Sequence, residues 1–395
     1  MKTLRHAIVW FAVICCVMAV SLLFEKPRDA ALAFLFIIDM ATPEASDLYQ
    51  VVTDEIVVTH DSLDRESKKT LYYSIYSPPG NHKKSAIIMA HGFTEKGNND
   101  RRLQRMAHRM ARAGFIVMTP EFPMMRRFRI SMEDADNTME AFRIVKQRPD
   151  VDSSSIGLMG FSYGAGPVIM ALSDSSIRDQ VRFGVIFGGY FDIRKTLKYT
   201  LTGYYTTDTG QEMRSVSKNN DRWKFLLGNI PESGNEKSLV IFKSIIAQKI
   251  TDAGYDPGKN FLSLDSTHQS LYRFIENQNP SAFDVLYAAL PNDFRSKLEL
   301  ADLTSYAHLI HSYMIIGHSD QDRVVPYTES LALAKNLTSA PAPFVAVTSL
   351  FTHVNLKIEW GSLTQIFTET IQGFFRLWKM TYHIMRMRHI PVAIA

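Results

Sequence analysis

A serine between two glycines, placed where a β-like run gives way to a helical one, constrains this chain more than any other feature. The G-F-S-Y-G segment at 160–164 follows the apolar run 156–160 and precedes a helix rich in small residues. It fits the G-x-S-x-G pattern, in which a strained turn projects the serine hydroxyl above a sheet. A side chain at either glycine would collide with the neighbouring strand or helix. The pattern therefore predicts a strand, a sharp turn that carries Ser162 as a nucleophile, and a helix.

Short β-like runs alternate with helical patterns along most of the 395 residues. Such alternation is typical of an α/β chain with a mostly parallel, doubly wound sheet. Runs 55–59 and 71–77 predict an initial hairpin, and helices are predicted at 102–113, at 133–146 and from 163 onwards. The arginines at 101, 102, 105, 109 and 112 are expected on exposed faces of the first helix. The later predicted strands are 86–90, 115–119, 156–160, 183–187, 312–317 and 344–348.

The alternation stops at Gly189 and resumes only at Ser312. The interval of about 120 residues is too long for a simple connection between two strands. It is rich in aromatic residues, as expected of an element that packs on a core and covers a pocket. We therefore expect one α/β domain over residues 46–395, with a helical cap insertion at about 190–305.

An apolar run at the N-terminus predicts a membrane anchor over residues 1–45. Residues 7–24 are apolar except for Ser21, and at about 1.5 Å per residue they nearly cross a hydrocarbon core of roughly 30 Å as one transmembrane helix. Lys2 and Arg5 precede the run, whereas the charges after it cancel. The positive-inside bias then places the N-terminus in the cytoplasm and the domain on the extracytoplasmic side, which in a bacterium is the periplasm.

Two other interpretations of this run stay open, a cleaved signal peptide and a buried helix. No small-x-small cleavage site follows the run directly, because leucine, phenylalanine and glutamate occupy positions 22–25. A second apolar stretch, 30–40, is too short to span a membrane. We expect it to lie at the membrane interface or to pack on the domain.

Composition narrows the function classes. The formal net charge of +4 is mild and spread over the chain, which gives no argument for a nucleic-acid partner. Both cysteines lie inside the first apolar run, so the rest of the chain has neither a disulfide nor a cysteine nucleophile. The sequence has no H-E-x-x-H motif, thiolate cluster or glycine-rich phosphate loop, and predicts no metal and no cofactor. It predicts no particular oligomeric state.

A serine hydroxyl is a weak nucleophile, and it needs a base that is itself oriented by an acid. In chains with this strand, serine and helix arrangement, the acid precedes the histidine in sequence. Of the twelve histidines, only His353 lies just after the last predicted strand. His353 is therefore the predicted base.

The loop H-S-D-Q-D-R-V-V-P at 318–326 resembles the H-[GS]-x-x-D-x-x-V-P loop of the α/β-hydrolase superfamily, especially of its dienelactone-hydrolase-like and prolyl-oligopeptidase-like branches. The resemblance implies the α/β-hydrolase fold, and its register implies Asp322 as the acid of a catalytic triad. Asp320 is the runner-up, and Asp192 is a further candidate. The resemblance covers about residues 70–190 and 305–375, whereas the cap and the membrane segment match no pattern of the superfamily.

Developing negative charge in acyl transfer needs two backbone N–H donors that form an oxyanion hole. The N–H of Tyr163, next to the nucleophile, is one candidate. The H-G-F segment at 91–93 resembles the H-G-x oxyanion loop of the superfamily, which implies the N–H of Phe93 as the other donor and a structural role for His91.

Together these features predict a membrane-anchored serine hydrolase that cleaves a carboxylic ester, with a small ester or short acyl substrate and an acyl-enzyme intermediate. One alternative is a serine peptidase of the prolyl-oligopeptidase-like type that acts on short peptides. The other is a non-catalytic binding protein on a hydrolase fold. The predicted cap sets the substrate, and a fold by itself conveys no specificity.

Overall fold

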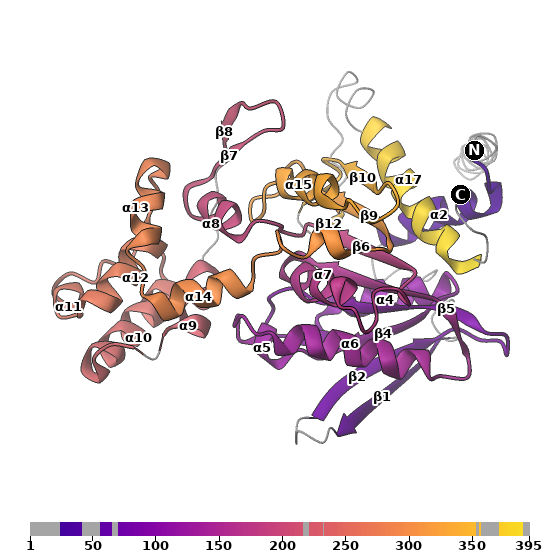
Figure 1. The fold of residues 1–395 in the computed structure, drawn as a ribbon, viewed down its shortest axis with the longest axis horizontal. Helices are drawn as coiled ribbons and strands as arrows, with labels where there is room; N and C mark the ends of the chain where they lie inside the picture. Colours follow the sequence, from indigo (N-terminus) through magenta and orange to yellow (C-terminus); the bar gives the residue numbers. More distant parts are fainter. Residues whose placement is uncertain are drawn as a thin grey trace, which may run out of the picture.

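The computed structural model describes residues 24–41, 56–64, 70–215, 221–231, 233–352, 355–356 and 371–389. Its centre is a sheet with the strand order β1-β2-β4-β3-β5-β6-β9-β10 (Figure 1). β2 pairs antiparallel with β1 and with β4, and all the other neighbours are parallel. The predicted hairpin and mostly parallel sheet are thus confirmed. The strands are β1 (Val57–Asp64), β2 (Thr70–Ser77), β3 (Lys84–Ala90), β4 (Ile116–Pro120), β5 (Val151–Phe161), β6 (Phe183–Phe187), β9 (Tyr313–His318) and β10 (Phe344–Val347).

Helices cover both faces of the sheet, because alternate side chains of each buried strand point to opposite faces. In β4, Ile116 and Met118 face one apolar core, whereas Val117 faces the other. The first core is covered by α6 (Glu133–Lys146), α7 (Ala165–Ser173) and α15 (Thr328–Asn336). The second is covered by α2 (Pro27–Ala41), α4 (Arg101–Arg112) and α17 (Ile371–Arg386). The sheet is therefore doubly wound.

α2 and α17 come from opposite ends of the chain and pack side by side (Figure 1). The indole nitrogen of Trp378 donates to the carbonyl oxygen of Ala30 over 2.6 Å. A partly buried ion pair of 2.6 Å joins Arg388 to Asp29. The apolar stretch 30–40 thus packs on the domain, one of its two expected positions. The predicted span 7–24 lies outside the described residues apart from Phe24, and no helix in the described ranges is long and apolar enough to cross a membrane.

The expectation that all five arginines of α4 lie on exposed faces is wrong for Arg109. Its guanidinium is buried, and its Nε lies 3.0 Å from Oδ2 of Asp39 on α2. Arg112 pairs with the same carboxylate over 3.3 Å. α2 covers α4, so the polar face of α4 around Arg109 and Arg112 forms ion pairs with α2 and is not a solvated surface.

The segment between β6 and β9 forms the helical layer that projects to one side of the sheet (Figure 1). It has its own apolar centre around Trp223, Phe242, Phe274 and Phe283, all buried. This core is continuous with that on the α6 face of the sheet. Its helices are α8 (Ile193–Thr202), α9 (Asp221–Asn229), α10 (Glu236–Thr251), α11 (Lys259–Leu262), α12 (Ser266–Glu276), α13 (Phe283–Ala288) and α14 (Asn292–Leu300).

The remaining elements are short. The cap carries the hairpin of β7 (Tyr204–Thr206) and β8 (Glu212–Arg214), and β11 (Phe351–Thr352) pairs with β12 (Asn355–Leu356) after the sheet. α5 spans Pro123–Arg126. Short 3₁₀ turns are η1 (Gly97–Asn99), η2 (Ser162–Gly164), η3 (Pro280–Ala282), η4 (Ala307–Leu309) and η6 (Met387–His389).

Candidate active site

Ser162 lies on a strained turn at the end of the central strand β5. The strand ends at Phe161, the turn η2 begins at Ser162, and α7 follows directly. Ser162 has φ +52°, a left-handed backbone conformation that residues other than glycine rarely adopt. Such strain persists only where the surroundings fix it, and it is common at active sites.

The two glycines of the motif are required by close approach. A β-carbon at Gly160 would lie 2.6 Å from the carbonyl oxygen of Gly164. One at Gly164 would lie 2.7 Å from the carbonyl oxygen of Ala90, at the end of the neighbouring strand β3. Both distances are shorter than real β-carbon contacts, so the turn excludes any side chain at these positions. This is the steric reason that the sequence pattern predicted.

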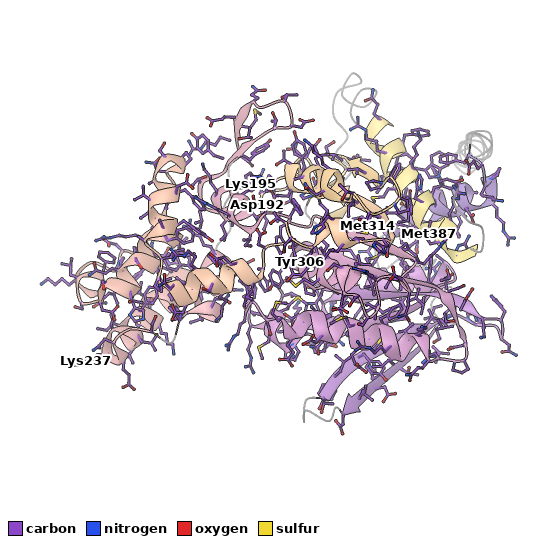
Figure 2. The ribbon with its side chains drawn as sticks, in the orientation of Figure 1. Asp192, Lys195, Lys237, Tyr306, Met314 and Met387 are labelled. Atoms are coloured by element: carbon purple, nitrogen blue, oxygen red, sulfur yellow. The ribbon has the colours of Figure 1, made fainter. Side chains whose placement is uncertain are left out.

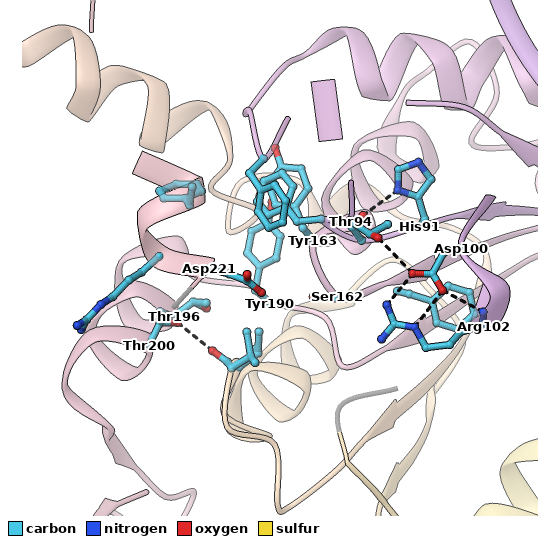
Figure 3. Close-up of a pocket in the computed structure, with 18 of the residues that line it drawn as sticks. His91, Thr94, Asp100, Arg102, Ser162, Tyr163, Tyr190, Thr196, Thr200 and Asp221 are labelled. Carbon is cyan, nitrogen blue, oxygen red and sulfur yellow. Dashed lines mark hydrogen bonds and ion pairs between the residues drawn. The ribbon is translucent and has the colours of Figure 1, made fainter. Parts of the chain in front are cut away.

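Ser162 lines a cavity of about 550 Å³ between the sheet and the cap. In Figure 3, Ser162 and Tyr163 lie between Asp100 and Arg102 on one side and the cap residues Thr196, Thr200 and Asp221 on the other. The cavity is of the size that holds small organic ligands. Its apolar wall on the cap side consists of Ile193, Leu197, Leu201, Phe225 and Ile275.

The loop after β3 brings Phe93 next to the serine turn. A β-carbon at Gly92 would lie 3.0 Å from Cβ of Ser162, so the loop backbone touches the nucleophile. The rings of Phe93 and Tyr163 stack with centroids 3.8 Å apart, and both residues line the cavity. Within the described residues, no loop or turn hydrogen bond uses the N–H of either one. The two residues that carry the predicted oxyanion donors thus lie side by side next to Ser162, and the role of their N–H groups stays a prediction.

His91 fixes the peptide plane that carries the N–H of Phe93. Its Nδ1 lies 2.7 Å from the carbonyl oxygen of Gly92, and because a carbonyl only accepts, Nδ1 carries the proton. Burial lowers the pKa of His91 to about 4, so the ring is neutral at neutral pH. In a trans peptide the N–H points opposite to the carbonyl, so the Phe93 N–H is turned away from His91. This geometry fits the structural role expected of His91.

Asp322 is buried in the loop after β9, with its carboxylate held by that loop. Its Oδ1 accepts the N–H of Val324 over 2.8 Å and that of Val325 over 3.0 Å, and both valines line the cavity. Its Oδ2 lies 3.4 Å from Nε2 of buried His318. Asp320, the alternative acid, has an exposed side chain two residues earlier. The structure therefore gives these two candidates opposite environments.

His353, the predicted base, lies outside the described residues, so its contact with Asp322 stays a prediction. The chain that leads to it runs beside the Asp322 loop, since the N–H of Thr348 donates to the carbonyl oxygen of His318 over 3.0 Å. Asp192, the third candidate acid, lies at the start of α8. It caps α8 by accepting the N–H of Lys195 over 3.0 Å, and the two side chains pair at 3.3 Å (Figure 2).

Two buried carboxyl groups near the site were not predicted from the sequence. Asp134 on α6 is fully buried, and neither oxygen has a hydrogen-bond partner among the described residues. Burial raises its pKa to about 8. Burial also raises the pKa values of Tyr163 and Tyr190, and the charge of Asp134 adds to both shifts. Glu329 on α15 accepts the N–H groups of Phe191 and Asp192, which ties the start of the cap to the sheet domain.

The apolar wall on the cap side of the cavity was also not predicted, although the sequence contains a local signal for its α8 residues. Ile193, Leu197 and Leu201 recur every four residues, which is the spacing of one helix face. No comparable signal marks Asp134, because an acidic residue in the first turn of a helix is ordinarily solvated.

No model of a protein family matches the sequence, and no curated protein matches it. The fold is similar to several solved structures. An acylaminoacyl peptidase from Pyrococcus horikoshii is 13% identical with a TM-score of 0.50, over 88% of this chain and 44% of that one. Est1E from Butyrivibrio proteoclasticus is 12% identical with a TM-score of 0.47, over 83% and 98%. The α/β hydrolase GrgF from Penicillium sp. sh18 is 14% identical with a TM-score of 0.48, over 84% and 99%.

The chain spans less than half the length of the Pyrococcus peptidase that it matches. At this level of identity the likeness concerns the fold and not the activity. Strand order, the antiparallel β2 and the strained serine turn after β5 agree with it. The chain therefore has the α/β-hydrolase fold that its sequence motifs predicted.

Proposed function

We propose that this chain is a membrane-anchored serine hydrolase that cleaves a carboxylic ester through an acyl-enzyme intermediate. The position of Ser162 carries the proposal. It occupies a strained turn with φ +52° in the wall of a cavity large enough for a small organic substrate. The loop with Phe93 closes on the same point. A nucleophile, a cavity and two nearby backbone donors are what acyl transfer requires.

In the first half of the reaction, Oγ of Ser162 attacks the ester carbonyl while His353 takes the hydroxyl proton. The carbonyl oxygen becomes negatively charged and accepts the N–H groups of Phe93 and Tyr163. Such donors are worth about 10²–10³ in rate each because they are oriented before the reaction begins. The tetrahedral intermediate then collapses, the alcohol leaves with the proton from His353, and Ser162 carries the acyl group.

In the second half, water attacks the acyl-enzyme, and His353 takes its proton and returns it to Ser162. Asp322 acts through His353, where it orients the ring and stabilises its positive charge. The carboxylate of Asp322 is suited to this role because two backbone N–H groups already fix one of its oxygens. Its other oxygen, Oδ2, is the one nearer His318.

Hydrolysis of an ester panel tests the proposal, with a panel of short peptides in parallel. We expect the wild-type chain to hydrolyse p-nitrophenyl esters and Ser162→Ala to lose that activity while it keeps the wild-type melting temperature. Cleavage of peptides without cleavage of esters would favour the peptidase alternative. Absence of both activities would favour the binding protein.

Membrane anchoring through residues 7–24 is part of the proposal, with the domain on the extracytoplasmic side. The apolar run 7–24 and the basic residues Lys2 and Arg5 before it support this part. Fusion of a reporter that is active only outside the cytoplasm tests the orientation. We expect an active reporter after residue 395, and an inactive one would reverse the topology.

A further inference from the structure

The cap presents a continuous apolar wall to the cavity of Ser162. α8 contributes Ile193, Leu197 and Leu201, which recur every four residues and so lie on one face of the helix. Phe225 of α9 and Ile275 of α12 extend the same wall. In Figure 3, Thr196 and Thr200 of α8 lie across the cavity from His91.

The two hydroxyl groups of α8 that line the cavity, those of Thr196 and Thr200, each donate to an oxygen of the protein. Thr196 donates to Oε2 of buried Glu329 over 3.2 Å. Thr200 lies 2.8 Å from the carbonyl oxygens of both Thr196 and Val324, and its single proton goes to one of them. A carbonyl or another acceptor group placed along α8 would lose hydrogen bonds to water and would find no free hydroxyl proton on this helix, which costs free energy.

The charged groups that line the cavity each have a partner of opposite charge or a carbonyl. Arg102 pairs with Asp100 over 2.7 Å, and Arg222 pairs with Glu276 over 3.4 Å. Arg105 donates to the carbonyl oxygen of Met40 over 3.0 Å. Asp221 lies 3.7 Å from Nζ of Lys224. Binding a charged substrate group would compete with these contacts, so the cavity favours an uncharged one.

From this wall we infer that the substrate is an ester of an uncharged, extended aliphatic acyl chain, which lies along the Ile193, Leu197 and Leu201 face of α8. The inference rests on the proposed function and adds the class of substrate to it. Apolar burial supplies the selectivity, because each methylene that leaves water contributes about the same free energy. The alcohol then leaves on the other side of Ser162, toward Arg102 and Arg105.

A chain-length series measures this directly. We expect kcat/KM for p-nitrophenyl acetate, butyrate, hexanoate and octanoate to rise about fourfold for each methylene that enters the cavity. The p-nitrophenyl monoester of suberic acid has the same chain length as the octanoate but ends in a carboxylate. It should be cleaved at least about tenfold less efficiently than the octanoate. A flat series, or a preference for the charged ester, overturns the inference.

Two cap variants locate the chain. Leu197→Trp fills the wall and should lower kcat/KM for octanoate at least about tenfold more than kcat/KM for acetate. Leu227→Trp adds the same bulk on α9 at an exposed position and should change neither value. Leu201→Ala, which removes bulk, should extend the preference to decanoate, and it serves where Leu197→Trp does not fold. Equal loss on acetate and octanoate in both wall variants would contradict the assigned position.

Labelling by a fluorophosphonate separates failure of the inference from failure of the proposed function. A chain that is labelled at Ser162 but shows a flat series is a serine hydrolase with another substrate. A chain that is neither labelled nor active on any ester lacks the proposed function, and the inference falls with it.

Discussion

The rings of Phe93 and Tyr163 stack with centroids 3.8 Å apart and planes 13° from parallel. These residues come from the loops after β3 and β5, and their backbone N–H groups are the two predicted oxyanion donors. The stack therefore couples two donors that are 70 residues apart in sequence through their side chains. Aromatic pairs of this kind contribute about 0.5–1.5 kcal/mol beyond the area they bury.

Removing this stack should lower kcat. Phe93→Ala keeps the backbone N–H but releases it from Tyr163, and we expect kcat on p-nitrophenyl acetate to fall about fivefold, as loss of about 1 kcal/mol implies. Leu201→Ala is the control, because Leu201 also lines the cavity but belongs to the cap. The steady-state measurement uses this small substrate because its kcat depends least on the shape of the cavity. Equal effects of the two variants would exclude the coupling.

The two candidate acids should differ by orders of magnitude. Asp322→Asn keeps an oxygen for the N–H groups of Val324 and Val325 but cannot stabilise a charged His353. We expect kcat to fall by about 10⁴, as for other triads of this kind. Asp320→Asn, at an exposed position, should stay within about twofold of wild type. Should Asp320→Asn be the inactive variant, the register taken from the superfamily is wrong.

Asp134 should make stability fall as the pH rises. Its pKa is about 8 in the folded chain against an ordinary value of 3.8. Between these values the unfolded chain releases a proton that the folded chain keeps, so the free energy of unfolding decreases with pH over that range. Asp134→Asn removes this dependence, and we expect its melting temperature to exceed that of wild type by a margin that grows from pH 4 to pH 8.

Asp136→Asn is the matched control for Asp134→Asn, because Asp136 lies on the same helix with an exposed side chain. Its melting temperature should follow that of wild type at every pH. A difference in melting temperature between Asp134→Asn and wild type that stays constant from pH 4 to pH 8 would show that Asp134 is not held as the neutral acid.

The ion pair between Asp39 and Arg109 should contribute strongly to stability. Asp39→Asn removes the carboxylate that faces a fully buried guanidinium, and loss of one partner of such a pair costs about 3–5 kcal/mol. Denaturant unfolding measures this cost. Glu25→Gln, which breaks the exposed pair of Glu25 with Arg386, should cost less than about 1 kcal/mol. Similar costs for the two variants would mean that α2 does not hold Arg109 as described.

Elements with a clear local period were predictable from the sequence. α6 has the predicted bounds Glu133–Lys146, and β6 has the predicted bounds Phe183–Phe187. The turn of Ser162 was predictable because sterics allow few residues beside the nucleophile, and the structure shows these close approaches. Local pattern is sufficient where the cause is local.

Features that depend on distant partners were not predictable. Arg109 pairs with Asp39, which lies on a helix 70 residues earlier in the chain. The sequence around Arg109 does not indicate this contact. Asp134 has the sequence context of a solvated helix start, yet α6 buries it behind the serine turn. The choice between Asp320 and Asp322 needed the superfamily register, because both follow the same strand. The prediction that His353 is the base rests only on its place after the last predicted strand.

The central claim is that Ser162 is the nucleophile of a serine hydrolase, and mass spectrometry after reaction with a fluorophosphonate tests it most directly. We predict one covalent adduct per chain, mapped by peptide sequencing to Ser162, and no adduct on Ser162→Ala. Labelling should be unchanged in Ser154→Ala, whose serine is exposed on β5, the strand that leads to Ser162. An unlabelled wild-type chain, or an adduct that persists in Ser162→Ala, would contradict it.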